Sequence, residues 1–148
     1  MTDAQALFLP VGDDLYALPV EWVREVVAAP VVTRLVTAPP IVLGLFNLRG
    51  HIVALLDTGA LMGIGSIGAV AFAVVVNTPQ GPAGLATSGF PKRGALDTPA
   101  GESELPGTGG LYHLDRGIGV LVDPASLLSP ERVGGPEFRG DLASVAVG

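Results

Sequence analysis

The chain contains no cysteine and has few charged or aromatic residues, and these shortages exclude several classes of protein. Without cysteine there is neither a disulfide framework nor a thiolate metal site. Charged residues make up only 15% of the sequence and hydrophobic residues 49%, a balance that does not suit a disordered chain. The 148 residues are therefore expected to form one domain, or two small packed halves, with a proper core.

Basic residues are scarce as well. Eight lysines and arginines stand against fourteen acidic residues, which gives a formal net charge of −6, and the basic residues are scattered along the chain. A protein that follows phosphates needs a basic stripe, so nucleic acid and anionic membrane surfaces are poor candidate partners. The first residues lack the basic and apolar regions of a signal peptide, and we expect a cytoplasmic protein.

One uncharged stretch imitates a membrane span. Residues 59–76 carry no charge over eighteen residues, the length at which a transmembrane helix becomes a candidate. The stretch contains four glycines, ends in three valines and has no flanking lysine or arginine. We therefore expect a loop and a buried strand here, and no direct membrane insertion.

Apolar runs alternate with glycine, proline and other turn residues along most of the chain. Such punctuation at roughly regular spacing is typical of small β-barrels and sandwiches. Four hairpins are predicted in this way: residues 5–11 with 15–18, 45–48 with 51–56, 70–77 with 83–87, and 111–114 with 118–122.

Three segments are expected to depart from this strand pattern. The valines of residues 20–27 recur at i, i+3 and i+7, which predicts a short amphipathic helix of about two turns. Residues 89–110 are rich in small and polar side chains, so we expect a long exposed loop. A proline begins residues 124–128, where it suits the first position of a terminal helical turn.

The segment from Gly63 to Gly68 matches the glycine pattern of a nucleotide-binding loop, G-x-G-x-x-G. A dinucleotide site also needs a helix after the loop and an acid about twenty residues further on. Here β-branched residues follow, and the next acid is Asp97. We interpret the match as a coincidence, and a small β-barrel nucleotide binder remains only as an alternative.

No other pattern in the sequence indicates catalysis or a bound cofactor. The two histidines, His51 and His113, have no cluster of carboxylates near them in the sequence. Nucleophile-elbow, zinc-protease and phosphate-loop motifs do not occur. We therefore expect no catalytic residues, no metal and no cofactor.

Residues 39–57 form the most informative part of the chain. A double proline precedes two apolar runs, and only Asn47-Leu48-Arg49-Gly50 interrupts them, which predicts a turn between two strands. Arg49 would lie at the tip of an otherwise apolar hairpin. This position favours an interface anchor, since arginine is common among the residues that dominate binding energies. An ordinary surface arginine bonded to a neighbouring carbonyl is an equally good interpretation of the spacing.

These residues resemble the CheW-like adaptor family of bacterial chemotaxis. The likeness begins at residues 15–26 and is strongest over residues 38–57, A-P-P-I-V-L-G-L-F-N-L-R-G-H-I-V-A-L-L-D. It covers most of residues 5–128, which we expect to form one CheW-like domain of two intertwined barrel subdomains. Residues 129–148 would then be a C-terminal tail.

The resemblance implies a mainly all-β fold of two packed five-stranded SH3-like β-barrels with short helices, and no catalysis. It implies an adaptor that couples the cytoplasmic tip of chemoreceptors to the regulatory domain of the histidine kinase CheA. By position, Val23, Glu25, Arg49 and Gly50 fall where the family contacts the receptor. Residues 86–89 depart from the family's signature, so the alternative is a diverged member that serves another chemosensory pathway, such as pilus motility.

Overall fold

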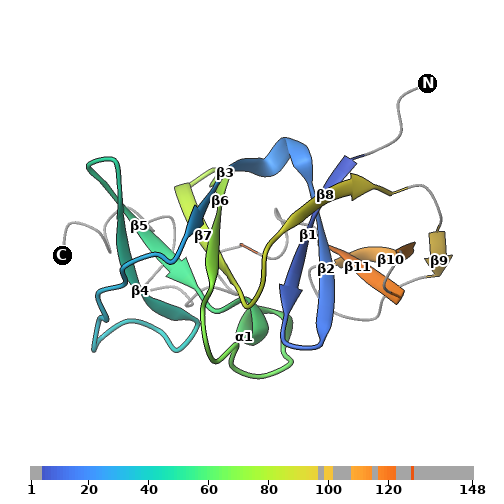
Figure 1. The fold of residues 1–148 in the computed structure, drawn as a ribbon. Helices are drawn as coiled ribbons and strands as arrows, with labels where there is room; N and C mark the ends of the chain where they lie inside the picture. Colours follow the sequence, from blue (N-terminus) through green and yellow to red (C-terminus); the bar gives the residue numbers. More distant parts are fainter. Residues whose placement is uncertain (1–4, 97–98, 102–107, 115–116, 123–127, 129–148) are drawn as a thin grey trace.

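The computed structural model describes residues 5–96, 99–101, 108–114, 117–122 and 128, and it consists mainly of β-strands (Figure 1). The elements in chain order are β1 (Gln5–Val11), β2 (Asp14–Pro19), the 3-10 turn η1 (Val20–Trp22), β3 (Val23–Ala28), β4 (Val42–Leu48), β5 (His51–Leu56), α1 (Thr58–Met62), β6 (Phe72–Thr78), β7 (Gly81–Thr87), β8 (Lys92–Ala95), β9 (Pro99–Gly101), β10 (Thr108–Leu114) and β11 (Gly117–Val122). The expected all-β fold is confirmed.

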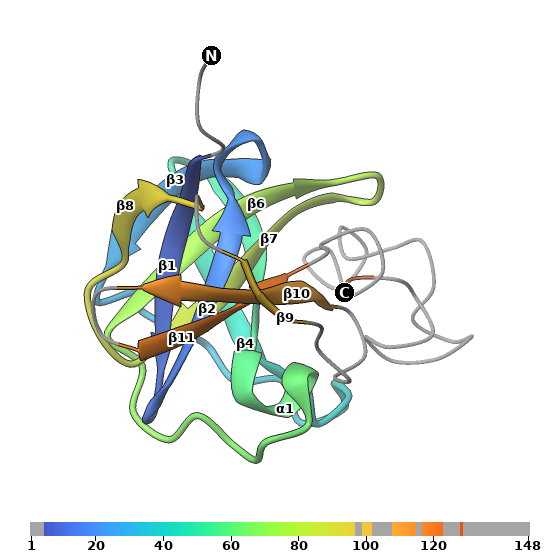
Figure 2. The same ribbon diagram turned by 90° about the vertical axis from the view of Figure 1, so that its right-hand side faces the viewer.

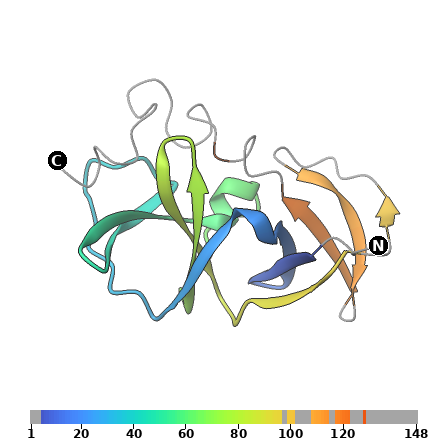
Figure 3. The same ribbon diagram turned by 90° about the horizontal axis from the view of Figure 1, so that it is seen from above.

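The strands form two sheets that lie side by side (Figure 3). The first sheet has six strands in the order β8-β1-β2-β11-β10-β9, and the second has five in the order β3-β6-β7-β5-β4. A parallel pair between β2 and β11 joins the start of the chain to its last described strands. The two sheets are therefore intertwined rather than being the two halves of the sequence (Figure 2). Strand pairing closes neither sheet into a complete barrel, and the first has one strand more than expected.

The central strands of the second sheet, β6 and β7, are buried on both faces, which explains their long apolar runs. Val74 and Val76 of β6 belong to the core that this sheet shares with the first sheet. Val75, between them, belongs to a second core on the inner side of the curled sheet, together with Phe46 of β4. A strand covered on both sides has no exposed face, so its sequence shows no alternation of polar and apolar residues.

All four predicted hairpins are present, as the pairs β1–β2, β4–β5, β6–β7 and β10–β11. In the β4–β5 hairpin Leu48 pairs with His51, so the loop is Arg49-Gly50. Their φ angles are 50° and 88°, and a two-residue turn with positive φ at both positions matches the natural twist of the strands. The side-chain oxygen of Asn47 accepts a hydrogen bond from the Gly50 amide at 2.8 Å, which fixes the turn.

The helix expected over residues 20–27 is wrong. Only Val20–Trp22 forms a 3-10 turn, and Val23–Ala28 is strand β3, paired with β6. Along β3 the residues alternate between partly buried and exposed, which is a period of two. The valines that fit a helical spacing fit this strand equally well, and β-branched side chains favour it.

The loops are more ordered than the sequence suggested. A loop is predicted for the first part of residues 59–76, but this part begins with the short helix α1, which lies between the two sheets (Figures 1 and 3). The expected loop at 89–110 contains β8, β9 and the start of β10. Of the helical turn expected at 124–128 the structure describes only Leu128, which is buried. The rest of that turn and the tail at 129–148 lie outside the described residues.

A buried carboxylate organises the glycine-rich segment that follows β5. Asp57 is 2% exposed, and its Oδ1 atom accepts hydrogen bonds from the amides of Ala60 and Ile67, both at 3.0 Å. The other oxygen, Oδ2, accepts one from the Ser66 hydroxyl at 3.0 Å. Asp57 thus caps the start of α1 and also holds the far end of the loop.

We predict that Asp57→Ala lowers the free energy of unfolding by about 3 kcal/mol, because two partly buried amides lose their charged acceptor. Urea unfolding followed by circular dichroism measures this change. Asp57→Asn is the matched control, since its amide oxygen can replace Oδ1 and its loss should be clearly smaller. Equal losses in the two variants would contradict the role given to Oδ1.

Tyr16 of β2 makes the stability of the fold depend on pH in the alkaline range. The residue is 1% exposed, and burial, with a smaller effect from the Asp14 charge, raises the pKa of its hydroxyl to about 12. The folded protein therefore retains the proton more tightly than the unfolded chain, whose tyrosine ionises near pH 10. Stability is thus unaffected below pH 10 and falls as the pH rises from 10 to 12.

We expect the loss between pH 10 and pH 12 to reach roughly 2 kcal/mol. The difference in unfolding free energy between the unmodified chain and Tyr16→Phe isolates this contribution from other groups that titrate in the same range. Absorbance of the tyrosinate gives an independent measurement of the pKa. A difference that stays constant with pH would show that Tyr16 does not cause the effect.

Candidate functional site

The candidate site lies where the two outer strands of the second sheet, β3 and β4, approach each other. We call the space between them the β3–β4 seam. At one end, just beyond β3, Thr33 and Leu45 form an isolated backbone pair, with N–H···O distances of 2.7 and 2.8 Å. A Cβ atom on Gly44 would lie 2.4 Å from the Thr33 carbonyl oxygen, so this closure requires glycine at residue 44.

The other end of the seam is bridged by an ion pair between Glu25 of β3 and Arg49 in the β4–β5 turn. The guanidinium donates from both terminal nitrogens, Nη1 to Oε2 at 2.8 Å and Nη2 to Oε1 at 2.5 Å. The Arg49 side chain is nevertheless 68% exposed, against 23% for Glu25. Such an exposed pair adds little to stability, but its two-point geometry fixes the orientation of the guanidinium. The remaining N–H donors of Arg49 are open to solvent.

The backbone at Arg49 shows that folding alone does not favour arginine there. Its φ of 50° is left-handed, a conformation that a residue with a Cβ atom adopts at an energy cost of about 1 kcal/mol or more. Asparagine and glycine are the usual residues at this position of the turn. A long charged side chain in a strained, exposed turn is better explained by recognition than by stability.

The four sequence-predicted residues lie around the same end of the seam. The structure brings Glu25 and Arg49 into direct contact, with Gly50 beside them. A Cβ atom on Gly50 would meet no atom within 4 Å, so this side of the turn is open to an approaching molecule. Val23, opposite Val76 on β6, packs partly against the shared core, so its side chain also has a structural part.

Between its two closed ends the seam opens into a groove that the sequence did not predict. Its volume is about 620 Å³, and it is lined by residues 27–31, Thr33, residues 45–47 and Ile52. Most of these side chains are apolar, and none of the described residues that line the groove is acidic. Ala29, with φ of 46°, and Pro30 end β3 and direct the chain toward β4. Pro30 was the one feature of the sequence that indicated the end of β3 at this point.

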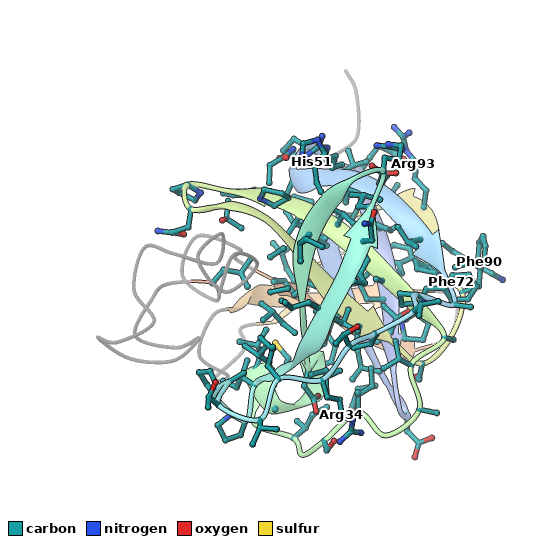
Figure 4. All side chains as sticks on the ribbon, turned by 90° about the vertical axis from the view of Figure 1, so that its left-hand side faces the viewer. Arg34, His51, Phe72, Phe90 and Arg93 are labelled. Carbon is teal, nitrogen blue, oxygen red and sulfur yellow. The ribbon has the colours of Figure 1, made fainter. Side chains whose placement is uncertain are left out.

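Basic side chains flank the groove. Arg34 follows Thr33 at one end, and His51 follows the Arg49-Gly50 turn at the other. Figure 4 looks onto β4 and β5 and shows Arg34 and His51 at opposite ends of this face. Arg34 therefore places a positive charge at one end of the rim, and at the other end the charge of Arg49 is paired with Glu25.

The glycine loop of the alternative nucleotide site is folded around Asp57. The Ile67 amide, a donor that a phosphate would need, is bonded to the Asp57 carboxylate. In the described part of the chain no three histidine or acidic residues are grouped so that they could hold a metal ion. None of the described helices is long and apolar enough to cross a membrane.

The architecture is thus that of two intertwined β-sheets with a charged bridge between the outer strands of one of them. The family model of the CheW-like domain matches residues 5–132, and the chain belongs to this family. The structure is similar to the crystal structure of the scaffolding protein TtCheW from Thermoanaerobacter tengcongensis, with a TM-score of 0.74 and 21% sequence identity, over 86% of this chain and 88% of that chain. A search of curated proteins gives no significant match.

The strained turn leads to a prediction about stability. Arg49→Asn should leave the free energy of unfolding unchanged or raise it by up to about 1 kcal/mol, because relief of the left-handed strain offsets the loss of an exposed ion pair. Urea unfolding of the two proteins measures the difference. A decrease of more than about 1 kcal/mol would mean that the ion pair holds the fold together.

Proposed function

We propose that the protein is a non-enzymatic cytoplasmic adaptor that couples the cytoplasmic tip of chemoreceptors to the histidine kinase CheA in bacterial chemotaxis. Membership of the CheW-like family supports the general role of a chemotaxis scaffold. The observation that carries the finer proposal is the Glu25–Arg49 bridge. Two residues to which the family resemblance assigns receptor contact, 24 positions apart in the sequence, meet in one exposed bidentate pair.

The geometry suits recognition of a partner by Arg49. Glu25 holds two of the guanidinium nitrogens, and the exposed remainder can donate hydrogen bonds to carbonyl or carboxylate oxygens of the receptor. Because the ion pair already fixes the side chain, less conformational entropy is lost when the partner binds. Gly50 lets the partner approach the turn closely. Glu25 acts in this scheme as a positioning residue.

The alternative of a diverged member in another chemosensory pathway uses the same face with a different partner. The departure at residues 86–89 supports it, since these residues lie at the end of β7 and in the connection to the first sheet, away from the seam. A change there leaves the Glu25–Arg49 bridge intact.

Binding of a receptor signalling fragment, with and without the CheA regulatory domain, tests the proposal. Arg49→Ala should weaken receptor binding at least tenfold while it changes the unfolding free energy by less than about 1 kcal/mol. Arg93→Ala is the matched control, because Arg93 is an exposed arginine on β8 in the other sheet, and it should bind as the unmodified chain does. Unchanged receptor binding by Arg49→Ala would refute the site.

The charge-reversed double variant Glu25→Arg, Arg49→Glu separates contact from positioning. It can restore the bridge with opposite polarity, so the fold should be kept. If Arg49 touches the receptor, binding stays weak, because the exposed group is now a carboxylate. Full recovery of binding would mean that the bridge, and not the guanidinium, is what matters.

A further inference from the structure

We infer that the β3–β4 seam binds an extended peptide segment of a partner, which pairs with the free edge of β4 as an added strand. This inference goes beyond the adaptor function, since it concerns the backbone edge and not the receptor contact of Arg49. It does not depend on the identity of the receptor or the kinase.

The first support is the direction of the backbone groups along β4. Leu45 donates to Thr33 and accepts from it, so the N–H and C=O groups of Leu45 point away from β5 and into the seam. Backbone groups alternate in direction along a strand, and Asn47 is two residues further on, so its N–H and C=O groups point the same way. The structure shows no backbone bond for Asn47 across the seam within the described residues. Asn47 thus offers a free donor and acceptor.

The second support is that the free edge faces a groove and not bulk solvent. Asn47 lines the groove of about 620 Å³, with the apolar side chains of Val27, Val31 and Ile52 around it. Val31 is 86% exposed and Ile52 40% exposed. An added strand would cover these side chains with its own while it pairs with the β4 backbone, as in other cases of strand addition.

The third support is that this part of the edge has no protection. Sheet edges are usually blocked by a lysine, a proline, a bulge or a covering segment. Between Leu45 and Arg49 the β4 edge has neither lysine nor proline, and its single irregularity lies earlier, between Val42 and Gly44. Pro30 lies in the opposite wall, where the chain turns away and opens the seam.

The charged side chains around the groove indicate the composition of the peptide. None of the described residues that line the groove is acidic; Arg34 lies near one end, and Arg49, paired with Glu25 but 68% exposed, lies near the other. The complementary partner is a short apolar segment in extended conformation with aspartate or glutamate on its flanks. A helix is less suitable, because its backbone groups are bonded within itself and cannot pair with Asn47.

The test uses the purified full chain and a phage-displayed library of random linear eight-residue peptides. We expect enrichment of sequences with an apolar centre and acidic flanks. The two tested variants are Asn47→Pro, which removes the N–H group that points into the seam, and Asn47→Ala, which keeps it. Both lose the side-chain bond to Gly50, so they differ in the backbone donor. Proline is tolerated at a strand edge where no ladder bond is lost.

The selected peptides should bind Asn47→Pro at least tenfold more weakly than Asn47→Ala, as measured by calorimetry. Methylation of the peptide's backbone nitrogens should weaken binding to the unmodified chain to a similar extent. Failure to enrich any peptide, equal binding to the two variants, or binding that survives methylation would each overturn the inference. Because no receptor or kinase is present, these results are independent of the Arg49 experiments.

Discussion

The curl of the second sheet is the constraint on which the rest of the structure depends. This sheet must bend far enough to enclose a core on its inner side while its outer side packs against the first sheet. Two glycines permit the bend. A Cβ atom on Gly84 would lie 2.8 Å from the Phe46 ring that fills the inner core, and one on Gly44 would collide with the Thr33 backbone. A side chain at either position would therefore force the Phe46 ring or the Thr33 backbone to move.

The Glu25–Arg49 bridge and the two hydrophobic cores have different roles. Valines and leucines on both faces of the sheet supply the hydrophobic stabilisation, and the tip of the β4–β5 hairpin contributes little to it. At that tip the chain places a left-handed arginine and holds it with a half-buried glutamate. A rigid apolar body that carries a preformed charged group suits a protein that acts by holding partners, since no part of the site needs to move.

The sequence allowed the prediction of all four hairpins because apolar runs and turn residues are local signals. The same local signals placed Arg49 at the correct turn. The helix at residues 20–27 failed because valines at i, i+3 and i+7 fit either period, and the choice was made by pairing with β6, nearly fifty residues away. The seam itself could not be foreseen. It depends on the left-handed Ala29 and on the meeting of Thr33 with Leu45, which no local pattern records.

The loop from Gly63 to Gly68 also shows what a local sequence pattern cannot predict. Its glycines match a phosphate-binding pattern, but the pattern does not reveal that the Ile67 amide of the loop already donates to the preceding aspartate. Whether a glycine loop can bind an anion depends on which group already accepts from its N–H groups. Here the acceptor is Asp57, which is part of the chain and buried. Before a motif of this kind is interpreted as an anion-binding site, the neighbouring carboxylates that can accept hydrogen bonds from its N–H groups must be considered.

Asn47 and Arg49 are two residues apart on one hairpin, a separation of about 7 Å along a strand. Two independent macromolecules cannot occupy positions this close, because each would exclude the other. A partner that contacts the Arg49 guanidinium and a segment that pairs with Asn47 must therefore belong to the same molecule or compete. In the first case the backbone edge adds affinity to a contact whose specificity comes from the arginine. In the second case binding of the partner that contacts Arg49 would depend on whether the added strand is present, and this short hairpin would then couple two binding events.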